Sequence, residues 1–147
     1  MRCAFLEGKT LELISKLIKQ YKDDLLTPTK QVVMRKYDLD KIKLARKRLL
    51  ENLQDAPTIE QLSSLVGINR QKLKTGFKSV YGNTIYKALR EERLEHASLL
   101  LMAGRSVKEA AEEVGYANQG HFASRFKEKY GVLPKDYLKT IRSKLEV

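Results

Sequence analysis

Apolar residues recur along this chain at intervals of three and four, with polar residues between them. No stretch alternates convincingly with a period of two, which is the pattern of a half-buried strand. Glycine and proline fall between the apolar runs, where helices would end. The pattern predicts an all-α protein with helices at about 2–26, 38–54, 58–67, 69–81, 85–103, 106–115, 118–130 and 135–144.

The first predicted helix carries an apolar stripe at coiled-coil spacing. The stripe consists of Leu11, Ile14, Ile18, Tyr21 and Leu25. Such spacing forms a seam along which a helix pairs with a second copy of itself. Leu13 and Leu17 widen the stripe, so an amphipathic helix that packs on its own chain fits equally well. We predict a homodimer helix or an ordinary amphipathic helix, ended by Thr27-Pro28 and followed by a basic connector over 30–37.

The strongest pattern in the chain is an internal repeat. Residues 58–89 align with residues 106–138 after one insertion. The matched pairs are Ile59 and Val107, Leu62 and Ala110, Val66 and Val114, Gly67 and Gly115, Leu73 and Phe122, Phe77 and Phe126, Tyr81 and Tyr130, and Gly82 and Gly131. Each copy opens with the spacing of a capping box, Thr58 with Gln61 and Ser106 with Glu109. Gly67 and Gly115 can each end a helix in the left-handed conformation, so each copy is predicted to be two helices joined by a short turn.

Helices are also predicted before the repeat and between its copies. The helix over 38–54 would bury Leu39, Ile42, Ala45, Leu49 and Leu53 and carry Arg46, Lys47 and Arg48 on its opposite side. The connecting helix would begin after Thr84, which can cap it, and end before Gly104. From Ile85 to Ala103 it would span roughly 28 Å. We also expect residues 99–102 to lie in the core.

Two helices joined by a glycine-containing turn are typical of a helix-turn-helix, whose second helix enters the major groove of DNA. A single such pattern is a weak signal, because many cores contain two helices and a glycine turn. Two capped copies make the signal stronger. One turn of B-DNA is about 34 Å, so the connecting helix plus side-chain reach could place two reading helices in adjacent grooves.

The charge of the chain favours a nucleic acid as its partner. The 147 residues carry a net charge of +11, as expected of a nucleic-acid binder, although a membrane surface or an acidic protein would also fit. The first predicted reading helix carries four cations and no acid: Arg70, Lys72, Lys74 and Lys78. The helix before the second reading helix carries Glu109, Glu112 and Glu113. This separation of sign indicates an orientation on DNA.

The chain resembles the DNA-binding domain of AraC-type bacterial transcription regulators over about residues 38–139. The most specific residues are Val114-Gly115-Tyr116, His121-Phe122-Ala123, Phe126-Lys127, Tyr130-Gly131-Val132, Pro134 and Tyr137; others are Leu62, Val66, Gly67, Leu73, Arg93, Leu94, Ala97, Leu100 and Leu101. The resemblance implies regulation of transcription by sequence-specific binding of double-stranded DNA. Residues 67–77 and 2–18 resemble the branch that senses iron-siderophore complexes. The family normally carries an N-terminal sensing or dimerising domain, and residues 1–37 offer room only for a helix.

By motif position, eight residues are expected to contact bases: Arg70, Gln71, Lys74, Thr75, Gln119, Gly120, His121 and Ser124. Arg and Lys can pair with guanine edges, and Gln with adenine. Gly120 departs from the usual side-chain donor and would weaken readout there. Five residues are expected at phosphates: Asn69, Lys78, Asn118, Arg125 and Lys127.

The other function classes fit less well. There is no glycine-rich phosphate loop, nucleophile elbow or paired His and Cys, so we expect that the chain is not an enzyme. Neither His96 nor His121 has a partner at metal-ligand spacing, and no cofactor is expected. The lone Cys3 and the absence of a membrane-spanning run point to the cytoplasm. The main alternative is a helical interaction module, an anti-regulator acting through the N-terminal helix, which the basic reading helix argues against.

We therefore predict four parts. Residues 1–37 form an N-terminal helix and basic connector, 38–84 a first helix-turn-helix subdomain, 85–104 a connecting helix and 105–147 a second helix-turn-helix subdomain. Double-stranded DNA is the expected partner, RNA polymerase is a further candidate, and a membrane is not expected.

Overall fold

The computed structural model describes residues 2–26 and 36–146. These residues form eight helices and no strand, which confirms the all-α prediction for the described part of the chain. The chain divides into two compact units, Met1–Arg35 and Lys36–Val147, and each is described by itself.

The first unit consists of one helix, α1 (Arg2–Leu26), at the position predicted from the apolar spacing. The side chains of Leu11, Ile14 and Ile18 are 67%, 46% and 51% exposed, so the described part of the stripe is uncovered. The side chains of Tyr21 and Leu25, the predicted end at Thr27-Pro28 and the connector over 30–35 lie outside what the structure describes.

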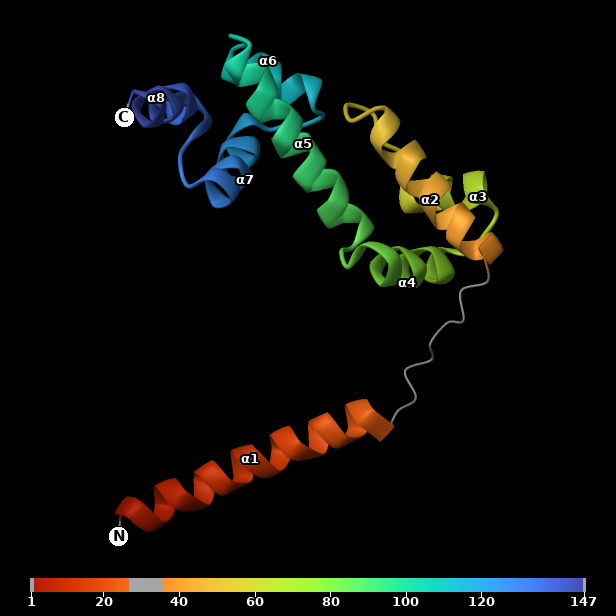
Figure 1. Ribbon diagram of the computed structural model, residues 1–147, viewed down its shortest axis with the longest axis vertical. Helices are drawn as coiled ribbons and strands as arrows, with labels where there is room; N and C mark the ends of the chain where they lie inside the picture. The colour runs from red at the N-terminus through yellow and green to blue at the C-terminus, as the bar shows by residue number, and fades with distance from the viewer. Residues whose placement is uncertain (1, 27–35, 147) are drawn as a thin grey trace. The chain divides into compact units, whose positions relative to one another are not determined.

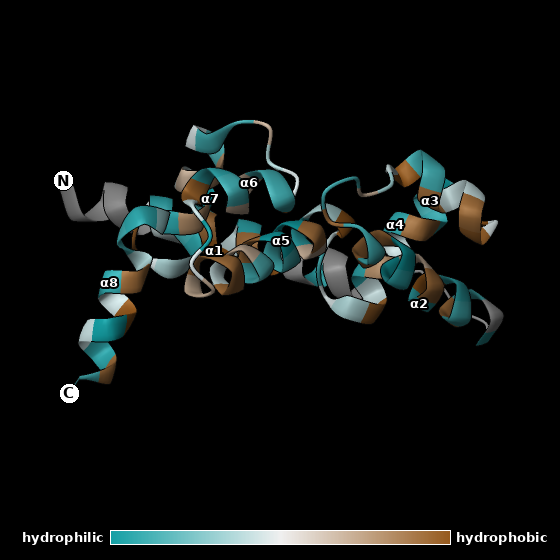
Figure 2. Ribbon diagram, turned by 90° about the horizontal axis from the view of Figure 1, so that it is seen from above, coloured by the Kyte–Doolittle hydropathy of each residue, from teal (hydrophilic) through white to brown (hydrophobic). Residues whose placement is uncertain are grey.

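The second unit holds seven helices in two groups along one central helix. They are α2 (Lys36–Glu51), α3 (Ile59–Val66), α4 (Arg70–Tyr81), α5 (Ile85–Met102), α6 (Val107–Glu113), α7 (Gln119–Tyr130) and α8 (Pro134–Leu145). Helices α2, α3 and α4 pack on one another and lie toward one end of α5, whereas α6, α7 and α8 lie toward its other end (Figures 1 and 2). We call α3 with α4 the first motif, α6 with α7 the second motif, and α4 and α7 the reading helices.

Helix boundaries follow the predicted caps. Thr58 Oγ1 accepts a hydrogen bond from the Gln61 N–H at 3.2 Å, and Gln61 Oε1 accepts one from the Thr58 N–H at 2.9 Å. Ser106 and Glu109 form the same reciprocal pair before α6. Between the helices of each motif, Gly67 and Gly115 have φ values of +69° and +89°, a conformation that L side chains rarely adopt.

The predicted helix over 38–54 differs at both of its ends. Helix α2 begins at Lys36 and ends at Glu51, three residues earlier than expected. Its end coincides with a local side-chain hydrogen bond, in which the Asp55 N–H donates to Asn52 Oδ1 at 3.1 Å. An asparagine side chain competes with the helix in this way by offering the backbone a local partner.

The repeat has the same core in both copies. Leu73 and Phe77 in α4 and the matched Phe122 and Phe126 in α7 are all 0% exposed. Burial of each such side chain stabilises the fold by about 1.5–3 kcal/mol. In the second motif these residues belong to a cluster with Leu94, Ala97 and Leu101 of α5, Ala110 and Ala111 of α6, and Val114, which follows α6.

The prediction that residues 99–102 are core residues was wrong for two of them. Leu101 is 3% exposed, but Leu99 and Met102 are 59% and 53% exposed. Helix α5 turns one face toward its neighbours, and the 3.6-residue period places Leu94, Ala97 and Leu101 on that face. Leu99 and Met102 therefore fall on the open side.

Candidate nucleic-acid interface

The four predicted base-contacting residues of the first motif share one exposed side of α4. Arg70, Gln71, Lys74 and Thr75 are all exposed, whereas Leu73, Gly76 and Phe77 on the other side are buried. Gln71 Nε2 donates to Thr75 Oγ1 at 3.4 Å, one helical turn away. The structure thus brings the four together in the N-terminal half of the helix, which is the part that a helix-turn-helix presents to base edges.

The start of this helix is built by Asn69. Its side-chain oxygen accepts from the Lys72 N–H at 2.8 Å and so satisfies one of the unpaired N–H groups at the helix start. Asn118 does the same for α7 by accepting from the His121 N–H at 2.9 Å. The side chains of these two predicted phosphate contacts act as caps, so their backbone N–H groups are what remains for an anion.

An ion pair spans the turn of the first motif and was not foreseen. Arg70 Nη1 lies 3.0 Å from Glu60 Oε1, and both side chains are more than 60% exposed. A hydrogen bond from a backbone N–H at the start of α3 lowers the pKa of Glu60, and the Arg70 guanidinium lowers this pKa further. Opposite charges were visible in the sequence, but only the turn geometry brings them together.

A second ion pair ties the first reading helix to α2. Lys72 Nζ lies 2.9 Å from Asp38 Oδ1, and the Asp38 side chain is 9% exposed. Lys72 therefore contributes its charge to the packing of α4 on α2. Of the four cations of this helix, Lys74 and Lys78 are the exposed pair with no ion pair to any residue in the described ranges.

Lys74 and Lys78 border a hollow of about 550 Å³ between α3, α4 and the start of α5. Its floor is largely apolar, and Tyr86, 68% exposed, lies on its edge. The two ammonium groups therefore meet solvent beside a hollow that could admit part of a polymer backbone.

The second reading helix presents a less charged surface. Gln119, Gly120, His121 and Ser124 are exposed on α7, as the motif positions require, and none of them is a Lys or Arg. A Cβ added to Gly120 would lie 3.2 Å from Asn118 Oδ1, so a side chain at this position would crowd the capping oxygen of Asn118. Lys127 is exposed, while Arg125 pairs with Glu128 at 2.9 Å within the same helix.

Lys129 anchors this helix to α5. Its ammonium lies 2.8 Å from Glu91 Oε2 and donates to the Glu91 carbonyl at 3.3 Å. Burial lowers the pKa of Lys129, but the hydrogen bond to Glu91 and the neighbouring charges outweigh burial, so that the pKa is raised. The Tyr130 hydroxyl donates to the Leu94 carbonyl at 3.4 Å and adds a second tie.

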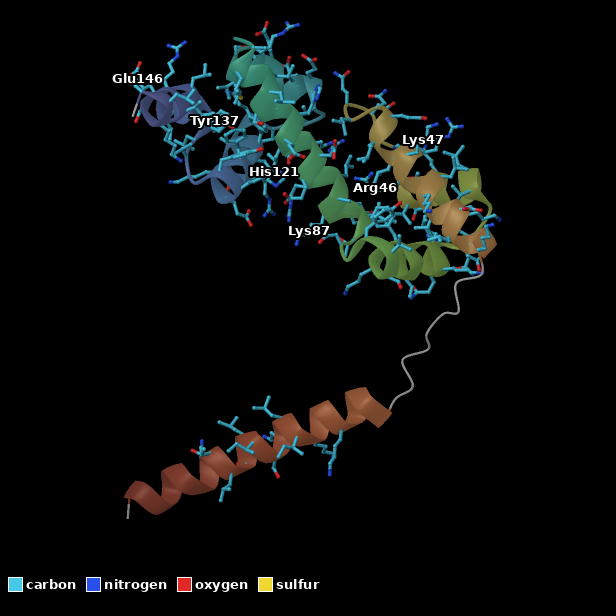
Figure 3. The ribbon with its side chains drawn as sticks, in the orientation of Figure 1. Arg46, Lys47, Lys87, His121, Tyr137 and Glu146 are labelled. Atoms are coloured by element: carbon cyan, nitrogen blue, oxygen red, sulfur yellow. The ribbon has the colours of Figure 1, made fainter. Side chains whose placement is uncertain are left out.

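Helix α2 places its basic residues on two sides. In Figure 3, Arg46 extends toward α4, and its guanidinium carbon lies 5.2 Å from the centre of the Tyr81 ring. Lys47 lies on the outer side of the helix (Figure 3). The predicted basic face of α2 is thus divided, because Arg46 covers an aromatic ring of the first reading helix.

Two capped helix pairs that each expose the start of their second helix are typical of helix-turn-helix proteins. Residues 62–140 match the helix-turn-helix domain family. The chain belongs to this family. Within it, the chain is of the AraC type, whose members are DNA-binding transcription regulators.

Known AraC-type and related proteins match most of the second unit. The xylose operon regulatory protein of Escherichia coli strain K12 is 38% identical over 80 residues, which are 54% of this chain and 20% of the relative. A probable AraC family transcriptional regulator from Rhodopseudomonas palustris is 28% identical, with a TM-score of 0.62 over 69% of this chain and 96% of the other. The DNA-binding domain of the global transcriptional factor AdpA, solved in complex with a target DNA, is 23% identical; its TM-score is 0.65 over 71% of this chain and 95% of the other. The chain spans about a fifth of the length of the first of these relatives.

The AraC-type unit separates charge between its helices. Helix α6 carries Glu109, Glu112 and Glu113, all exposed, and is mainly hydrophilic in Figure 2. A hydrogen bond from the Ser106 backbone N–H, followed by one from the Ser106 side chain, lowers the pKa of Glu109. Negative charge is therefore concentrated on α6, the first helix of the second motif, although α6 also carries Lys108 and α7 carries Glu128 beside its cations.

Metal-ligand groups and membrane-spanning helices are both absent from the described part of this AraC-type chain. Within residues 2–26 and 36–146, no three His, Cys, Asp or Glu side chains are grouped as ligands of a metal ion. Over the same ranges, no helix is both long and apolar enough to span a bilayer.

Proposed function

We propose that this chain regulates transcription by reading two adjacent major-groove segments of double-stranded DNA with α4 and α7. The observation that carries the proposal is the pair of capped reading helices toward opposite ends of α5, each with its N-terminal half exposed. Helix α5 has 18 residues, which is a length of roughly 27 Å. With side-chain reach, this separation suits one turn of B-DNA, which is about 34 Å. AdpA, a relative in fold, binds DNA with its corresponding domain.

In this proposal the two motifs contribute differently. Arg70, Gln71, Lys74 and Thr75 contact bases from α4, where Arg and Lys favour guanine. Gln119, Gly120, His121 and Ser124 form the matching surface of α7, which lacks cations and offers weaker, neutral readout. Lys78, Arg125, Lys127 and the N–H groups after Asn69 and Asn118 contact phosphates. The first motif therefore supplies most of the charge-assisted base contact.

The N-terminal unit is proposed to pair two chains. Leu11, Ile14 and Ile18 of α1 form an exposed stripe at coiled-coil spacing, which Tyr21 and Leu25 would extend. Sedimentation of the full chain tests this assignment: Ile14→Ser and Ile18→Ser together should convert a dimer into a monomer. An unchanged sedimentation coefficient would contradict pairing through α1.

The remaining assignments follow from the proposed role. The chain acts by binding DNA and not by catalysis. It works in the cytoplasm, where bacterial DNA is found. RNA polymerase is the natural second partner of a transcription regulator. Residues 67–77 favour the branch of the family that senses iron-siderophore complexes.

A selection from a random duplex pool tests the proposal. The full chain should enrich a motif of two blocks about one helical turn apart. The winning duplex and a scrambled control are then titrated at several salt concentrations. Much tighter binding of the winner is expected. If no motif is enriched and both duplexes show the same steep salt dependence, the chain binds DNA through charge alone and the proposal is wrong.

A further inference from the structure

The backbone that follows α2 lies directly on the turn of the second motif. A Cβ built on Gly115 would be 2.7 Å from the Leu53 carbonyl oxygen and 2.7 Å from the Gln54 carbonyl oxygen. Real Cβ atoms do not approach backbone atoms this closely, and the φ of +89° excludes most side chains independently. Position 115 therefore requires glycine on two grounds. The turn needs a positive φ, and the segment that precedes the first motif approaches too closely for a Cβ.

Arg93 of α5 lies at the same junction. Its Nε donates to the Leu53 carbonyl at 2.9 Å, and its Nη2 would be 2.8 Å from a Cβ on Gly115. Its guanidinium carbon is 6.0 Å from the centre of the Tyr116 ring, within cation–π range. Burial lowers the pKa of Arg93 and raises that of Tyr116, so both groups are partly withdrawn from water. One side chain therefore contacts the end of α2 and the turn of the second motif.

This contact changes how the two motifs are connected. Helix α5, on which both motifs pack, connects them as one rod. A contact between Leu53 and Gly115, closed by Arg93, adds a second connection beside that rod. Because interiors and tight backbone contacts deform little, two connections fix both distance and rotation.

We infer that Arg93 and Gly115 fix the relative positions of α4 and α7, so that the chain accepts one spacing between two DNA blocks. Arg93 is in this view a positioning residue, which selects DNA without touching it. The inference rests on the proposed two-block DNA recognition and adds the origin of its spacing. One base pair shifts a block by about 3.4 Å and turns it by about a tenth of a helical turn. A fixed pair of reading helices cannot follow such a shift.

Spacing variants of the selected duplex test the inference. The two blocks are separated by the selected distance, or by one or two base pairs more or fewer, and each duplex is titrated with the full chain. The wild type should prefer the selected spacing strongly. Arg93→Met removes the guanidinium. In this variant the ratio of affinity for the selected spacing to affinity for the neighbouring spacings should fall about tenfold, the size expected for loss of a charged hydrogen bond.

Further variants separate positioning from stability. Arg93→Lys keeps a charge and a donor and should restore part of the spacing preference. Arg105→Gln removes an exposed charge just beyond α5 and should weaken all spacings alike. Gly115→Ala should also broaden the preference, and if it does not fold, Arg93→Met and Arg93→Lys still decide the question. General destabilisation would lower binding to every duplex without changing their order.

A distance measurement without DNA gives an independent readout. Spin labels are attached at Ser79→Cys on α4 and Lys127→Cys on α7, with Cys3→Ser to remove the native thiol. Ile14→Ser and Ile18→Ser are added to keep the labelled chain monomeric. With Arg93 present it should give one narrow distance distribution, and Arg93→Met should broaden it. Unchanged distances together with an unchanged spacing profile would overturn the inference and leave the proposed function intact. A wild type that selects no two-block motif would overturn both.

Discussion

The carboxylate of Glu60 lies 3.0 Å from the guanidinium of Arg70, across the turn of the first motif. The pair joins α3, the first helix of this motif, to the first residue of the reading helix α4. Both side chains are largely exposed, and such surface pairs contribute little to stability. Arg70 can therefore exchange this carboxylate for a base edge or a phosphate at small cost.

The first prediction is that Glu60→Gln tightens DNA binding. The substitution releases Arg70 and removes a negative charge close to the reading helix. Affinity for the selected duplex should rise severalfold at low salt, and less at high salt because of screening. Duplex titrations at two salt concentrations measure the effect. Glu51→Gln, which releases Arg48 on α2, is the matched control. Equal gains from both variants would mean that general charge, not Arg70, is responsible.

The second prediction concerns Lys74, which is exposed on the side of α4 that we propose contacts bases. Lys74→Ala should lose about 1–3 kcal/mol at one base pair of the first block and accept other bases there. Titration against duplexes substituted at each position locates that base pair. Lys47→Ala on the outer side of α2 is the control and should leave base preference unchanged. An equal loss on selected and random DNA would remove Lys74 from base readout.

The third prediction assigns Lys78 to phosphate. Lys78→Ala should weaken binding to all sequences alike and lower the slope of log affinity against log salt by about one. The slope is measured on the selected duplex and on a scrambled one. A loss confined to one base pair, with the slope unchanged, would place Lys78 at a base instead.

The fourth prediction is that Asp38 stabilises the first motif through Lys72. Asp38→Ala removes an ion pair of 2.9 Å whose carboxylate is nearly buried. Because the Lys72 side chain is 41% exposed and regains water, the loss should be only about 1 kcal/mol. Urea unfolding measures the free energy. Asp40→Ala, which changes an exposed carboxylate in the same helix, should cost much less. Similar losses of unfolding free energy from both variants would show that the ion pair with Lys72 does not stabilise the fold.

The fifth prediction follows from the lowered pKa of Glu109, whose ordinary value is 4.5. A carboxyl group with a lower pKa in the folded state stabilises the fold above its unfolded pKa. That contribution is lost as the pH falls through the folded value. Glu109→Gln keeps an acceptor for the Ser106 N–H but cannot titrate. The stability difference between wild type and variant should be constant at neutral pH and shrink below about pH 4.5. A difference that does not change with pH would contradict the linkage.

Much of the fold could be predicted because its signals are local. The caps at Thr58, Asn69, Thr84 and Ser106 involve a backbone N–H three residues away. Two aligned copies also reinforced each other, so that a weak helix-turn-helix pattern became a strong one. The end of α2 was misplaced because Asn52 forms a local turn that competes with an otherwise helical pattern.

The candidate surface was predicted in outline but not in its pairings. Motif position assigned Arg70, Gln71, Lys74 and Thr75 to one side of the first reading helix, and they are exposed on α4. It could not show that Arg70 faces Glu60 or that Lys72 faces Asp38, because each partner belongs to another helix. Nor could it distinguish Leu101 from Leu99, since burial on α5 depends on which face its neighbours cover.

The sequence by itself determined the helices, their caps, the repeat and the residues that each reading helix presents. These features depend on hydrogen bonds and side-chain spacing within a few residues of chain. Only the tertiary structure decided which cations are occupied by structural partners. It alone placed Arg93 against Leu53, and Leu53 against Gly115. Such contacts join residues that are distant along the chain, and they arise only once the cores of the two motifs have packed around α5.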